Sequence, residues 1–385
     1  MSEKKDKIIV GIADIHFGAF DAETLYTELH ECFIKQLKKL DSIDLIVISG
    51  DLFHNKLSFN SSSAKYSIEF FKELNEICIE KNAKLRVVKG THSHDNNQLD
   101  TISLYVNNID YKLFNKVDTE TFEDGTTILY LPEEYIENMD EYYADYFNKT
   151  YDIICGHGMI DTVSFLGMTQ ESETTMSKCP IFKSDKLIEI CKGPIIFGHI
   201  HKHQVIKKRI FYTGSFSRWS FGEEEDKGFA LFRYNPNNGD LSFDFIKNTL
   251  IRTYHTIELT VAEEMAKMDV YNQIDTILDV VKRCHSDFIR VKLILPSFIE
   301  NSKLLTDLIT ETFAKFKKVT LQVINLSNLS KDEQTKQKVN FLLEKYGFLF
   351  ENSISFAEKI SKFIKIKYNK NISLEEIEER IGELK

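Results

Sequence analysis

The sequence predicts an α/β fold: a layered domain with a mainly parallel sheet, a second and smaller α/β domain, and a helical tail. Two observations predict this fold. In the first half of the chain, short apolar runs of strand length alternate with longer segments whose apolar residues recur at helical spacing. Beyond about residue 253 the alternation starts again on a smaller scale, and the last part of the chain has helical spacing alone. A chain of 385 residues is long enough for more than one domain.

The elements of the first half are predicted in strand–helix order. Apolar runs typical of buried strands occupy 7–13, 44–49, 84–89, 126–132, 151–156 and 193–198, and helical spacing occupies 23–40 and 63–81. Such runs, separated by amphipathic helices, are typical of sheets that helices cover. Shorter strands with glycine turns are expected near 209–216 and 227–235.

The rest of the chain is predicted to form a small β-α-β-α-β domain and a helical extension. Its expected strands are 255–260, 287–296 and 319–326, with helices up to about 283 and over 304–316. Helical spacing continues from about 331, and Ser373 and Glu376 have the spacing of a capping box for a last short helix. We therefore expect three parts, at 1–252, 253–328 and 329–385.

The composition is that of an ordinary globular protein, with 42% hydrophobic and 28% charged residues. No apolar stretch reaches the roughly 20 residues that a membrane helix needs, and the N-terminus has no signal-peptide pattern. The six cysteines form no CxxC pair, so we expect reduced thiols, a cytoplasmic location and no membrane partner. The net charge of -10 argues against a broad nucleic-acid-binding surface.

Side chains suited to metal binding follow five of the predicted strands, at the point where each strand ends. In open α/β sheets, ligands bind outside the carboxyl ends of the strands, and residues two apart on an extended chain project to one face. Seven of the eleven histidines lie in these stretches, and an eighth, His203, comes two residues after the last of them. One such stretch alone is weak evidence, but five in this order indicate a metal site. The stretches are Asp14-Ile15-His16, Gly50-Asp51-Leu52-Phe53-His54, Gly90-Thr91-His92-Ser93-His94-Asp95, Gly156-His157-Gly158 and Gly198-His199-Ile200-His201.

This series of motifs resembles that of the calcineurin-like metallophosphoesterases. The resemblance implies a four-layer α/β/β/α sandwich in which two divalent metals lie between two packed sheets, here with a small α/β capping domain and a helical C-terminal tail. Within that family, the GDLFH stretch is similar to SbcD-type nucleases of DNA double-strand-break repair and their phage recombination-endonuclease relatives. The segment Tyr212–Glu223, followed by Lys227-Gly-Phe-Ala, is similar to a segment of those nucleases that general phosphatases lack.

The resemblance assigns a role to each stretch. It implies that Asp51 bridges both metals, because a carboxylate has two oxygens to share, and that His54 lies near the phosphate. Mixed histidine and aspartate ligands fit Mn²⁺ best, with Mg²⁺ as the other candidate. Two such ions about 3.5–4 Å apart can clamp a phosphodiester and generate hydroxide from a bound water. The implied ligands are Asp14, His16 and His201 for the first metal, and His157 and His199 for the second.

The third stretch departs from the family pattern G-N-H-D, in which the asparagine amide oxygen binds the second metal. One alignment places Thr91-His92 on the Asn-His pair, and the other places Ser93-His94-Asp95 on Asn-His-Asp, with two extra residues after the glycine. We favour the second because it keeps the His-Asp pair. Ser93 is then the expected metal ligand and His94 the catalytic histidine, with His92 as the alternative. In either alignment a hydroxyl, which is a poorer metal ligand, replaces the amide.

The resemblance further implies a manganese-dependent nuclease that acts on DNA ends, as an exonuclease or endonuclease. Such a chain forms a homodimer and docks through its C-terminal helices on an SMC-like ATPase of the SbcC type. Because that ATPase contributes much of the DNA grip, the acidic charge of this chain is compatible with the function. If a phage encodes the chain, it acts in the host cytoplasm. Two alternatives remain: a nucleotide phosphodiesterase or phosphatase with the same metal site, and a non-catalytic scaffold subunit with a weakened one.

Overall fold

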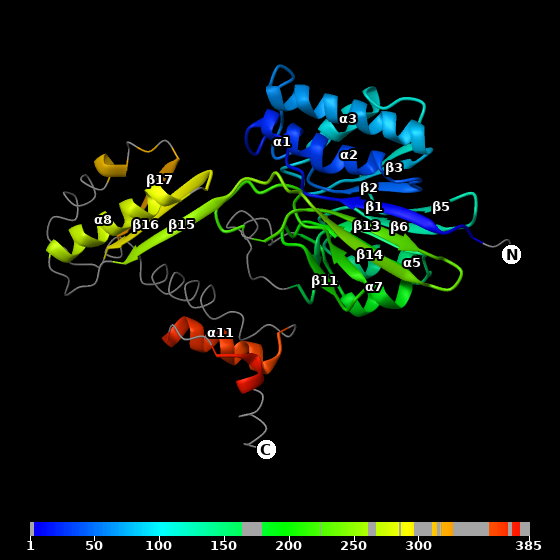
Figure 1. Ribbon diagram of the computed structural model, residues 1–385. Coiled ribbons are helices and arrows are strands. Elements are labelled where there is room, and N and C mark those ends of the chain that lie inside the picture. The colour runs from blue at the N-terminus through cyan, green and yellow to red at the C-terminus, as the bar shows by residue number, and fades with distance from the viewer. Residues whose placement is uncertain are drawn as a thin grey trace. The chain divides into compact units, whose positions relative to one another are not determined.

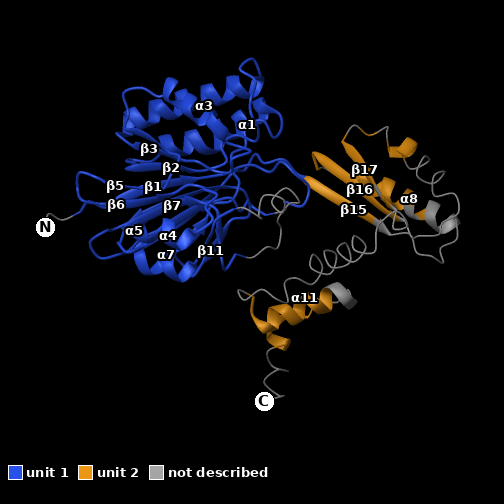
Figure 2. Cartoon of the chain, turned by 180° about the vertical axis from the view of Figure 1, so that it is seen from behind, with its two compact units in different colours: residues 1–163, 168–253 blue, residues 164–167, 254–385 orange. Residues whose placement is uncertain are grey.

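The computed structural model describes residues 4–163, 179–223, 225–260, 267–284, 286–295, 310–313, 316, 318–325, 354–368 and 372–377. The chain divides into two compact units (Figure 2). Of the described residues, 4–163 and 179–253, apart from 224, belong to the first unit, and those from 254 onward belong to the second. All of the residues predicted to bind metal or to act in catalysis lie in the first unit.

The described residues of the first unit form two six-stranded sheets (Figure 1) and one two-stranded sheet of β8 (Met159–Ile160) and β9 (Ile181–Phe182). In the first sheet four strands run parallel and two antiparallel strands close one edge. Its spatial order is β14 (Leu241–Lys247), β13 (Gly228–Tyr234), β1 (Lys7–Ile12), β2 (Leu45–Ser49), β3 (Lys84–Val88) and β4 (Tyr111–Phe114). In the second sheet the four central strands are parallel and each edge strand is antiparallel. Its spatial order is β11 (Gln204–Ile206), β12 (Ile210–Tyr212), β10 (Ile195–Gly198), β7 (Ile153–His157), β6 (Thr127–Leu131) and β5 (Asp118–Thr121).

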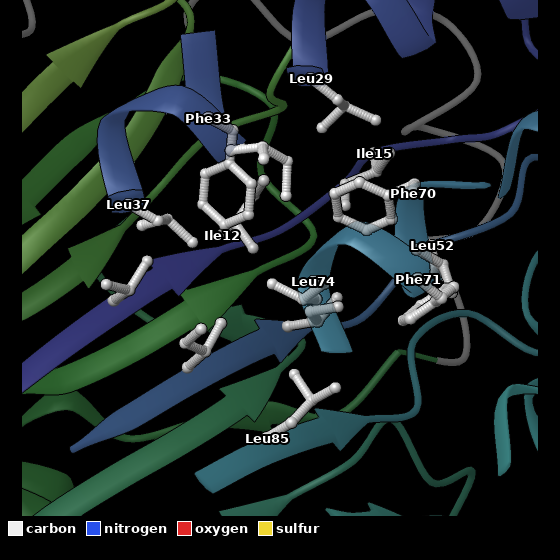
Figure 3. Packing of buried hydrophobic residues seen from close by; sticks show 14 of the residues in the cluster. Ile12, Ile15, Leu29, Phe33, Leu37, Leu52, Phe70, Phe71, Leu74 and Leu85 are labelled. Carbon is white, nitrogen blue, oxygen red and sulfur yellow. The ribbon is translucent and has the colours of Figure 1, made fainter. Parts of the chain in front are cut away.

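A helical layer covers the outer face of the first sheet (Figure 1). It consists of α1 (Ala22–Leu29), the π-helical turn η1 (His30–Ile34), α2 (Lys35–Lys38) and α3 (Ser62–Lys81). The Asp21 carboxylate accepts the Thr24 N–H at the start of α1, and the Ser61 hydroxyl accepts the Ala64 N–H at the start of α3. Figure 3 shows the apolar side chains that join this layer to the sheet, among them Ile12, Leu29, Phe33, Leu37, Phe70, Leu74 and Leu85.

The strands of the first sheet are buried on both faces, because a second cluster of apolar side chains fills the space between the sheets. In β2, Ile46 and Ile48 pack toward the helices, whereas Leu45 and Val47 pack toward the second sheet. This explains why the sequence reads as a continuous apolar run there. The helices α4 (Met139–Tyr142), α5 (Ala144–Phe147) and α7 (Ser184–Ile190) pack on the outer face of the second sheet. The predicted four-layer α/β/β/α sandwich is therefore confirmed.

The described part of the second unit contains a parallel three-stranded sheet and the helix α8 (Lys267–Arg283). The strands lie in the order β15 (Tyr254–Thr260), β16 (Phe288–Leu295) and β17 (Val319–Asn325). Ile274 and Ile277 of α8 pack with Val291 and Leu293 of β16. The strand order agrees with the predicted β-α-β-α-β pattern, although most of the predicted helix at 304–316 lies outside the described residues.

Two helical segments of the predicted tail are described, and each begins with a cap. Before α11 (Phe356–Tyr368), the Ser355 hydroxyl accepts the Glu358 N–H and the Glu358 carboxylate accepts the Ser355 N–H. The Ser373 hydroxyl accepts the Glu376 N–H at the start of the helical turn 374–377, which is where the sequence predicts a cap. Residues 326–353 lie outside the described part, and the division into a capping domain and a tail stays a prediction.

The sequence missed several elements of the first unit. The strand β5 lies at the edge of its sheet and pairs with β6 alone. Its sequence, Asp-Thr-Glu-Thr, has no apolar run, because its side chains are mostly exposed. The 3₁₀ segment η2 (Asn96–Leu104) follows the histidine-containing loop after β3. Within the described residues, no helix combines the length and the apolar character that crossing a lipid bilayer requires.

Candidate metal centre

Loops after five strands bring the predicted metal-binding residues together. The strands β1, β2 and β3 are parallel neighbours in one sheet, and β7 and β10 are parallel neighbours in the other. Their carboxyl ends therefore lie at one edge of each sheet. Hydrogen bonds join the two edges: the His199 N–H donates to Asp14 Oδ1 at 3.0 Å, and His157 Nδ1 lies 2.8 Å from the Ser49 carbonyl oxygen.

Four of the predicted ligands have a backbone conformation that residues with side chains seldom adopt. The φ angle is 49° at Asp14, 55° at His16, 48° at Asp51 and 92° at His199. Asp14 and His16 are therefore not on an extended chain, as the same-face argument assumed, and bends at both residues bring their side chains together. A positive φ costs on the order of 1–3 kcal/mol per residue, and such conformations cluster at binding and catalytic sites.

Two glycines allow the close approach of the loops. A Cβ atom on Gly50 would lie 2.1 Å from His157 Nδ1, and a Cβ atom on Gly90 would lie 2.3 Å from Asp51 Oδ1. Gly50 also has a φ of 82°, which favours glycine by itself. A larger residue at either position would displace a predicted metal ligand.

The first cluster of candidate ligands consists of Asp14, His16 and His201, whose ligand atoms lie within 4.8 Å of one another. His16 Nε2 and His201 Nε2 are 3.0 Å apart. Two nitrogens that bind one ion at about 2.1 Å and at roughly a right angle lie about 3 Å apart, so this spacing fits a shared ion. The carboxylate of Asp14 is fully buried beside them.

Residues after β12 hold His201 in place. The buried Glu223 carboxylate lies 3.2 Å from His201 Nδ1, and Lys227 Nζ donates to the His201 carbonyl at 2.9 Å. A carboxylate that accepts Nδ1–H fixes the tautomer of a histidine, so that the lone pair of Nε2 faces the ion. Glu223 also accepts the Trp219 N–H at 3.1 Å. The sequence analysis gave Glu223 no role, because its contact with His201 spans 22 residues.

The second cluster consists of Asp51, His157 and His199. His157 Nδ1 faces the Ser49 carbonyl oxygen, which can only accept a hydrogen bond, so Nδ1 carries the proton. The neutral ring then has its lone pair on Nε2. That buried Nε2 atom has no hydrogen-bond partner and lies 3.4 Å from Asp51 Oδ2. Nε2 of His199 is also buried without a hydrogen-bond partner. A lone pair that faces a carboxylate oxygen requires a proton or a metal cation between them, so the second cluster fits a metal ion.

Asp51 lies between the two clusters. Its Oδ2 atom is 3.4 Å from His157 Nε2 in the second cluster and 3.9 Å from His16 Nε2 in the first. This is the geometry expected of a carboxylate that two ions share.

Thr91 and Glu133 border the second cluster, and the sequence analysis selected neither as a ligand. Glu133 is fully buried, and its Oε2 atom lies 3.3 Å from His199 Nδ1 and 3.5 Å from His157 Nε2. Thr91 Oγ1 lies 3.1 Å from Asp51 Oδ2 and 3.2 Å from Glu133 Oε2. The one sequence signal for Glu133 is that it directly follows the apolar run at 126–132, as the histidines follow theirs.

The loop after β3 combines the two alignments. Thr91, directly after Gly90, reaches the second cluster, whereas His94 and Asp95 keep the places of the family's His-Asp pair. The N–H groups of His94 and Asp95 both donate to the Thr91 carbonyl at 3.0 Å. This tight turn leaves His92 and Ser93, the two residues between Thr91 and His94, exposed. Ser93 is one of those exposed residues and the structure does not bring it to either cluster. The structure therefore does not support our expectation that Ser93 reaches the second metal, because the side chain that it places beside Asp51 is that of Thr91.

Asp95 joins the loop after β3 to the loop after β2. Its buried carboxylate accepts four backbone N–H groups at 2.7–3.2 Å, those of Asp51, Leu52, Phe53 and Gly90. Burial and the nearby charge of Asp51 raise the pKa of Asp95 to about 7, and the backbone donors act against that rise. Asp95 thus positions Asp51 without being a ligand itself.

The two predicted catalytic histidines of this region flank the first cluster. The rings of His54 and His94 stack with centroids 5.3 Å apart, and they lie 5.5 Å and 4.9 Å from the His16 ring. Both are half-buried. The Trp219 ring lies 5.1 Å from His54 and 5.2 Å from His16. An aromatic side chain thus lies beside His16 of the first cluster and beside His54.

His92 is separate from this group. Its ring stacks on Tyr135 with centroids 4.4 Å apart, and its Nε2 atom lies 3.1 Å from the Glu133 carbonyl oxygen. The side chain is exposed. The structure therefore places His94, and not His92, next to the first cluster.

The buried charges of the two clusters balance one another. Burial raises the pKa of Asp14. Burial also acts to raise the pKa of Asp51, but the His157 charge outweighs it and the pKa lies well below its usual range. Burial acts to lower the pKa of His157, but Asp51, Asp14 and Glu133 hold it well above the usual value. These three carboxylates stabilise a positive charge at His157. A metal ion bound at the second cluster would supply positive charge at the same place.

A scan against protein-family models matches residues 8–238 to the calcineurin-like phosphoesterase family. The protein named "Putative phosphoesterase 244L" of Invertebrate iridescent virus 6 is 27% identical over 268 residues, which cover 66% of this chain and 86% of that protein. The uncharacterized protein R555 of Acanthamoeba polyphaga mimivirus is 26% identical over 244 residues, covering 58% of this chain but 17% of the viral protein. One solved crystal structure matches at 13% identity with a TM-score of 0.35, covering 63% of this chain and 100% of that chain, a likeness too weak to bear on fold or function.

Proposed function

Because the chain belongs to the calcineurin-like phosphoesterase family, we propose that it cleaves the phosphodiester bonds of DNA as the nuclease subunit of an SbcCD-like complex that processes DNA ends. Family membership and the two ligand clusters make the chain a metal-dependent phosphoester hydrolase. DNA as the substrate, and Mn²⁺ as the ion with Mg²⁺ as the other candidate, are the parts that we propose. The mixed imidazole and carboxylate donors favour Mn²⁺ over calcium.

The residues of the centre divide the work of hydrolysis. When bound, a pair of divalent ions neutralises phosphate oxygens and lowers the pKa of a bound water. Asp51 holds the two halves of the centre together, since one of its oxygens faces both clusters. His94, beside the first cluster, would donate to the phosphate oxygen on which charge develops. His54 would orient the phosphate or transfer a proton.

The observation that carries DNA as the substrate is the segment Tyr212–Phe229. Its sequence resembles SbcD-type nucleases, and its side chains contact the first cluster directly: Glu223 and Lys227 hold His201. The same segment puts Trp219, which is partly exposed, beside His16. An aromatic ring next to a phosphodiester site can stack on a nucleobase, which stabilises single-stranded nucleic acid by roughly 1–3 kcal/mol per base.

The partners are part of the proposal. We assign the docking of an SMC-like ATPase to the C-terminal helices, where the Phe356 ring at the start of α11 is 68% exposed and Leu374 of the last turn is 43% exposed. Apolar side chains in such positions are available to a partner helix. A homodimer acting on DNA ends in the cytoplasm completes the SbcCD-like arrangement.

Parallel assays on the full-length chain test the proposal. With Mn²⁺, we expect degradation of linear duplex DNA, its loss on adding EDTA, and little hydrolysis of the monoester p-nitrophenyl phosphate. Monoester hydrolysis without DNA cleavage would assign a phosphatase. If both ions are bound and neither substrate is cleaved, even by the complex with the ATPase partner and ATP, the chain is a scaffold subunit and the nuclease proposal is wrong.

A further inference from the structure

The second cluster lacks the amide ligand of the family pattern, and a carboxylate stands near the gap. Thr91 occupies the position directly after Gly90, and a neutral hydroxyl is a weak metal ligand. Glu133 comes from a different strand of the other sheet and approaches the same place. Its Oε2 atom lies 3.2 Å from Thr91 Oγ1, 3.3 Å from His199 Nδ1 and 3.5 Å from His157 Nε2.

These distances are those of donors around one ion. Ligand atoms that share a first-row metal at about 2.1 Å lie roughly 3–3.5 Å apart. Glu133 is fully buried, and its second oxygen, Oε1, has no hydrogen-bond partner. A buried carboxylate with an unpartnered oxygen is costly unless a cation or a further donor is nearby. The buried, unpartnered Nε2 atom of His157 belongs to the same cluster.

The thiol of Cys179 also lies close to Glu133. Cys179 is buried, and its Sγ atom lies within 4.8 Å of ligand atoms of Glu133 and His199. The thiol also lies 3.6 Å from the carbonyl oxygen of the next residue, Pro180. The first cluster offers carboxylate and imidazole donors only. Sulfur donors favour Zn²⁺ over Mn²⁺ and Mg²⁺, so the two halves of the centre differ in the ion that suits them.

We propose that Glu133 replaces the missing amide as a ligand of the second ion, and that Cys179 beside it makes this half of the centre select Zn²⁺ over Mn²⁺ and Mg²⁺. A carboxylate in place of an amide adds one negative charge to the ligands of the second ion. That ion is therefore held more tightly than an amide would hold it. The inference concerns ion binding alone, so it does not depend on DNA being the substrate, and it restricts the proposed preference for Mn²⁺ to the first half of the centre.

Ion binding is measured by equilibrium dialysis of the metal-free full-length chain against Zn²⁺, Co²⁺ or Mn²⁺. We expect the affinity for the second ion to fall in the order wild type, Glu133→Gln, Glu133→Ala, because the series removes first the charge and then the donor oxygen. Loss of a residue that only positions a ligand typically costs about 10–100-fold in metal affinity, so Glu133→Ala should cost at least that much. If Glu133→Ala binds the second ion as tightly as the wild type, or more tightly, Glu133 is a counter-charge to the histidines and the proposal is overturned.

Two further variants separate a lost ligand from a damaged fold. Glu134→Ala is the matched control, because Glu134 is also buried but its carboxylate accepts the Val117 N–H and the Tyr142 hydroxyl. It should keep both ions. Thr91→Asn added to Glu133→Ala should recover second-ion affinity, since it places an amide oxygen beside Asp51. The chain's one tryptophan, Trp219, lies beside the first cluster, so unchanged quenching of its fluorescence by the first Co²⁺ shows that each variant is folded.

The thiol has its own readout. Co²⁺ bound by a thiolate has an intense near-ultraviolet charge-transfer band that oxygen and nitrogen ligands do not produce. The wild type loaded with two Co²⁺ should show this band, and Cys179→Ser should lose it together with the preference for Zn²⁺ over Mn²⁺. Cys191→Ser is the control, because the buried Cys191 thiol contacts the carbonyl oxygens of Asp152, Gly193 and Pro194 and is in neither cluster. A wild-type complex without the band would refute the role of Cys179.

Discussion

The two ligand clusters that share Asp51 are supported in different ways. In the first cluster, His201 is held through its Nδ1 atom and its carbonyl by Glu223 and Lys227, which come from one segment of the chain. In the second cluster, His157 is held by the Ser49 carbonyl. Its other neighbours, which include Glu133, each belong to a loop that follows a different strand.

This difference has a physical consequence. The position of His201 in the first cluster depends on hydrogen bonds from one segment, so single changes in that segment can weaken one ion and spare the other. The geometry of the second cluster depends on how the two sheets face each other, with Thr91 from one sheet meeting Glu133 from the other. Substitution of a side chain that contacts both clusters should therefore weaken the binding of both ions.

The largest effect is expected at Asp51. Asp51→Ala removes the carboxylate oxygen that lies near His16 of the first cluster and His157 of the second, so hydrolysis should fall below detection and the number of tightly bound ions should drop. The ion content of the dialysed protein and the initial rate of hydrolysis measure this. Asp100→Ala is the control, because Asp100 is exposed outside both clusters. Two tightly bound ions in Asp51→Ala would show that the clusters are independent.

The next effect is expected at His94. His94→Ala should lower turnover by about 10²–10³-fold, the usual cost of losing a preorganised donor to developing charge, and should leave both ions bound. His92→Ala should have a much smaller effect, because its exposed ring stacks on Tyr135 away from the first cluster. Equal losses of turnover in the two variants would mean that neither histidine is the donor.

A smaller and more selective effect is expected at Glu223. Glu223→Gln weakens the acceptor that fixes His201 and should lower affinity for the first ion by about 10–100-fold. The affinity for the second ion should stay within about twofold, since Glu223 does not contact that cluster. Calorimetric titration with Mn²⁺ resolves the two binding steps. Equal weakening of both steps would contradict the separate support of the first cluster.

The smallest effect is on stability, at Glu28 of α1. The carboxylate of Glu28 accepts Asn248 Nδ2–H at 2.8 Å, and Asn248 also donates to the Phe216 carbonyl in the segment that supports the first cluster. Burial raises the pKa of Glu28 from 4.5 to about 7, against hydrogen bonds from Ser217 and Asn248.

The sign of the pH dependence follows from this shift. Between pH 4.5 and 7 the folded state keeps a proton on Glu28 that the unfolded state releases, so the free energy of unfolding falls as the pH rises through this range. In Glu28→Gln this decrease is absent. The free energy of unfolding of the variant, relative to that of the wild type, should therefore rise by about 3 kcal/mol between pH 4 and pH 8. Urea unfolding at both pH values measures it. A pH-independent difference would mean that Glu28 is ionised in the folded state.

Local patterns in the sequence predicted the strands of the first unit and much of the site, and the family resemblance supplied the four-layer arrangement. Continuous apolar runs predicted the buried strands β1, β2, β3, β6, β7 and β10, because a strand between two layers has no solvent face. Their polar ends predicted the loops that carry Asp14, His16, Asp51, His157, His199 and His201, which the structure gathers into two clusters. The catalytic and ligand roles of these residues stay predictions that the variants above test.

Only the tertiary structure decided how the second cluster is completed. Sequence spacing favoured Ser93, but the turn that closes on the Thr91 carbonyl leaves Ser93 exposed and puts Thr91 beside Asp51. Glu133 follows a strand that has no histidine, and it meets His199 across 66 residues of chain. Periodicity describes how a segment lies on its own sheet. Which residues of two sheets face each other depends on how the sheets pack, and no local pattern in the sequence records that contact.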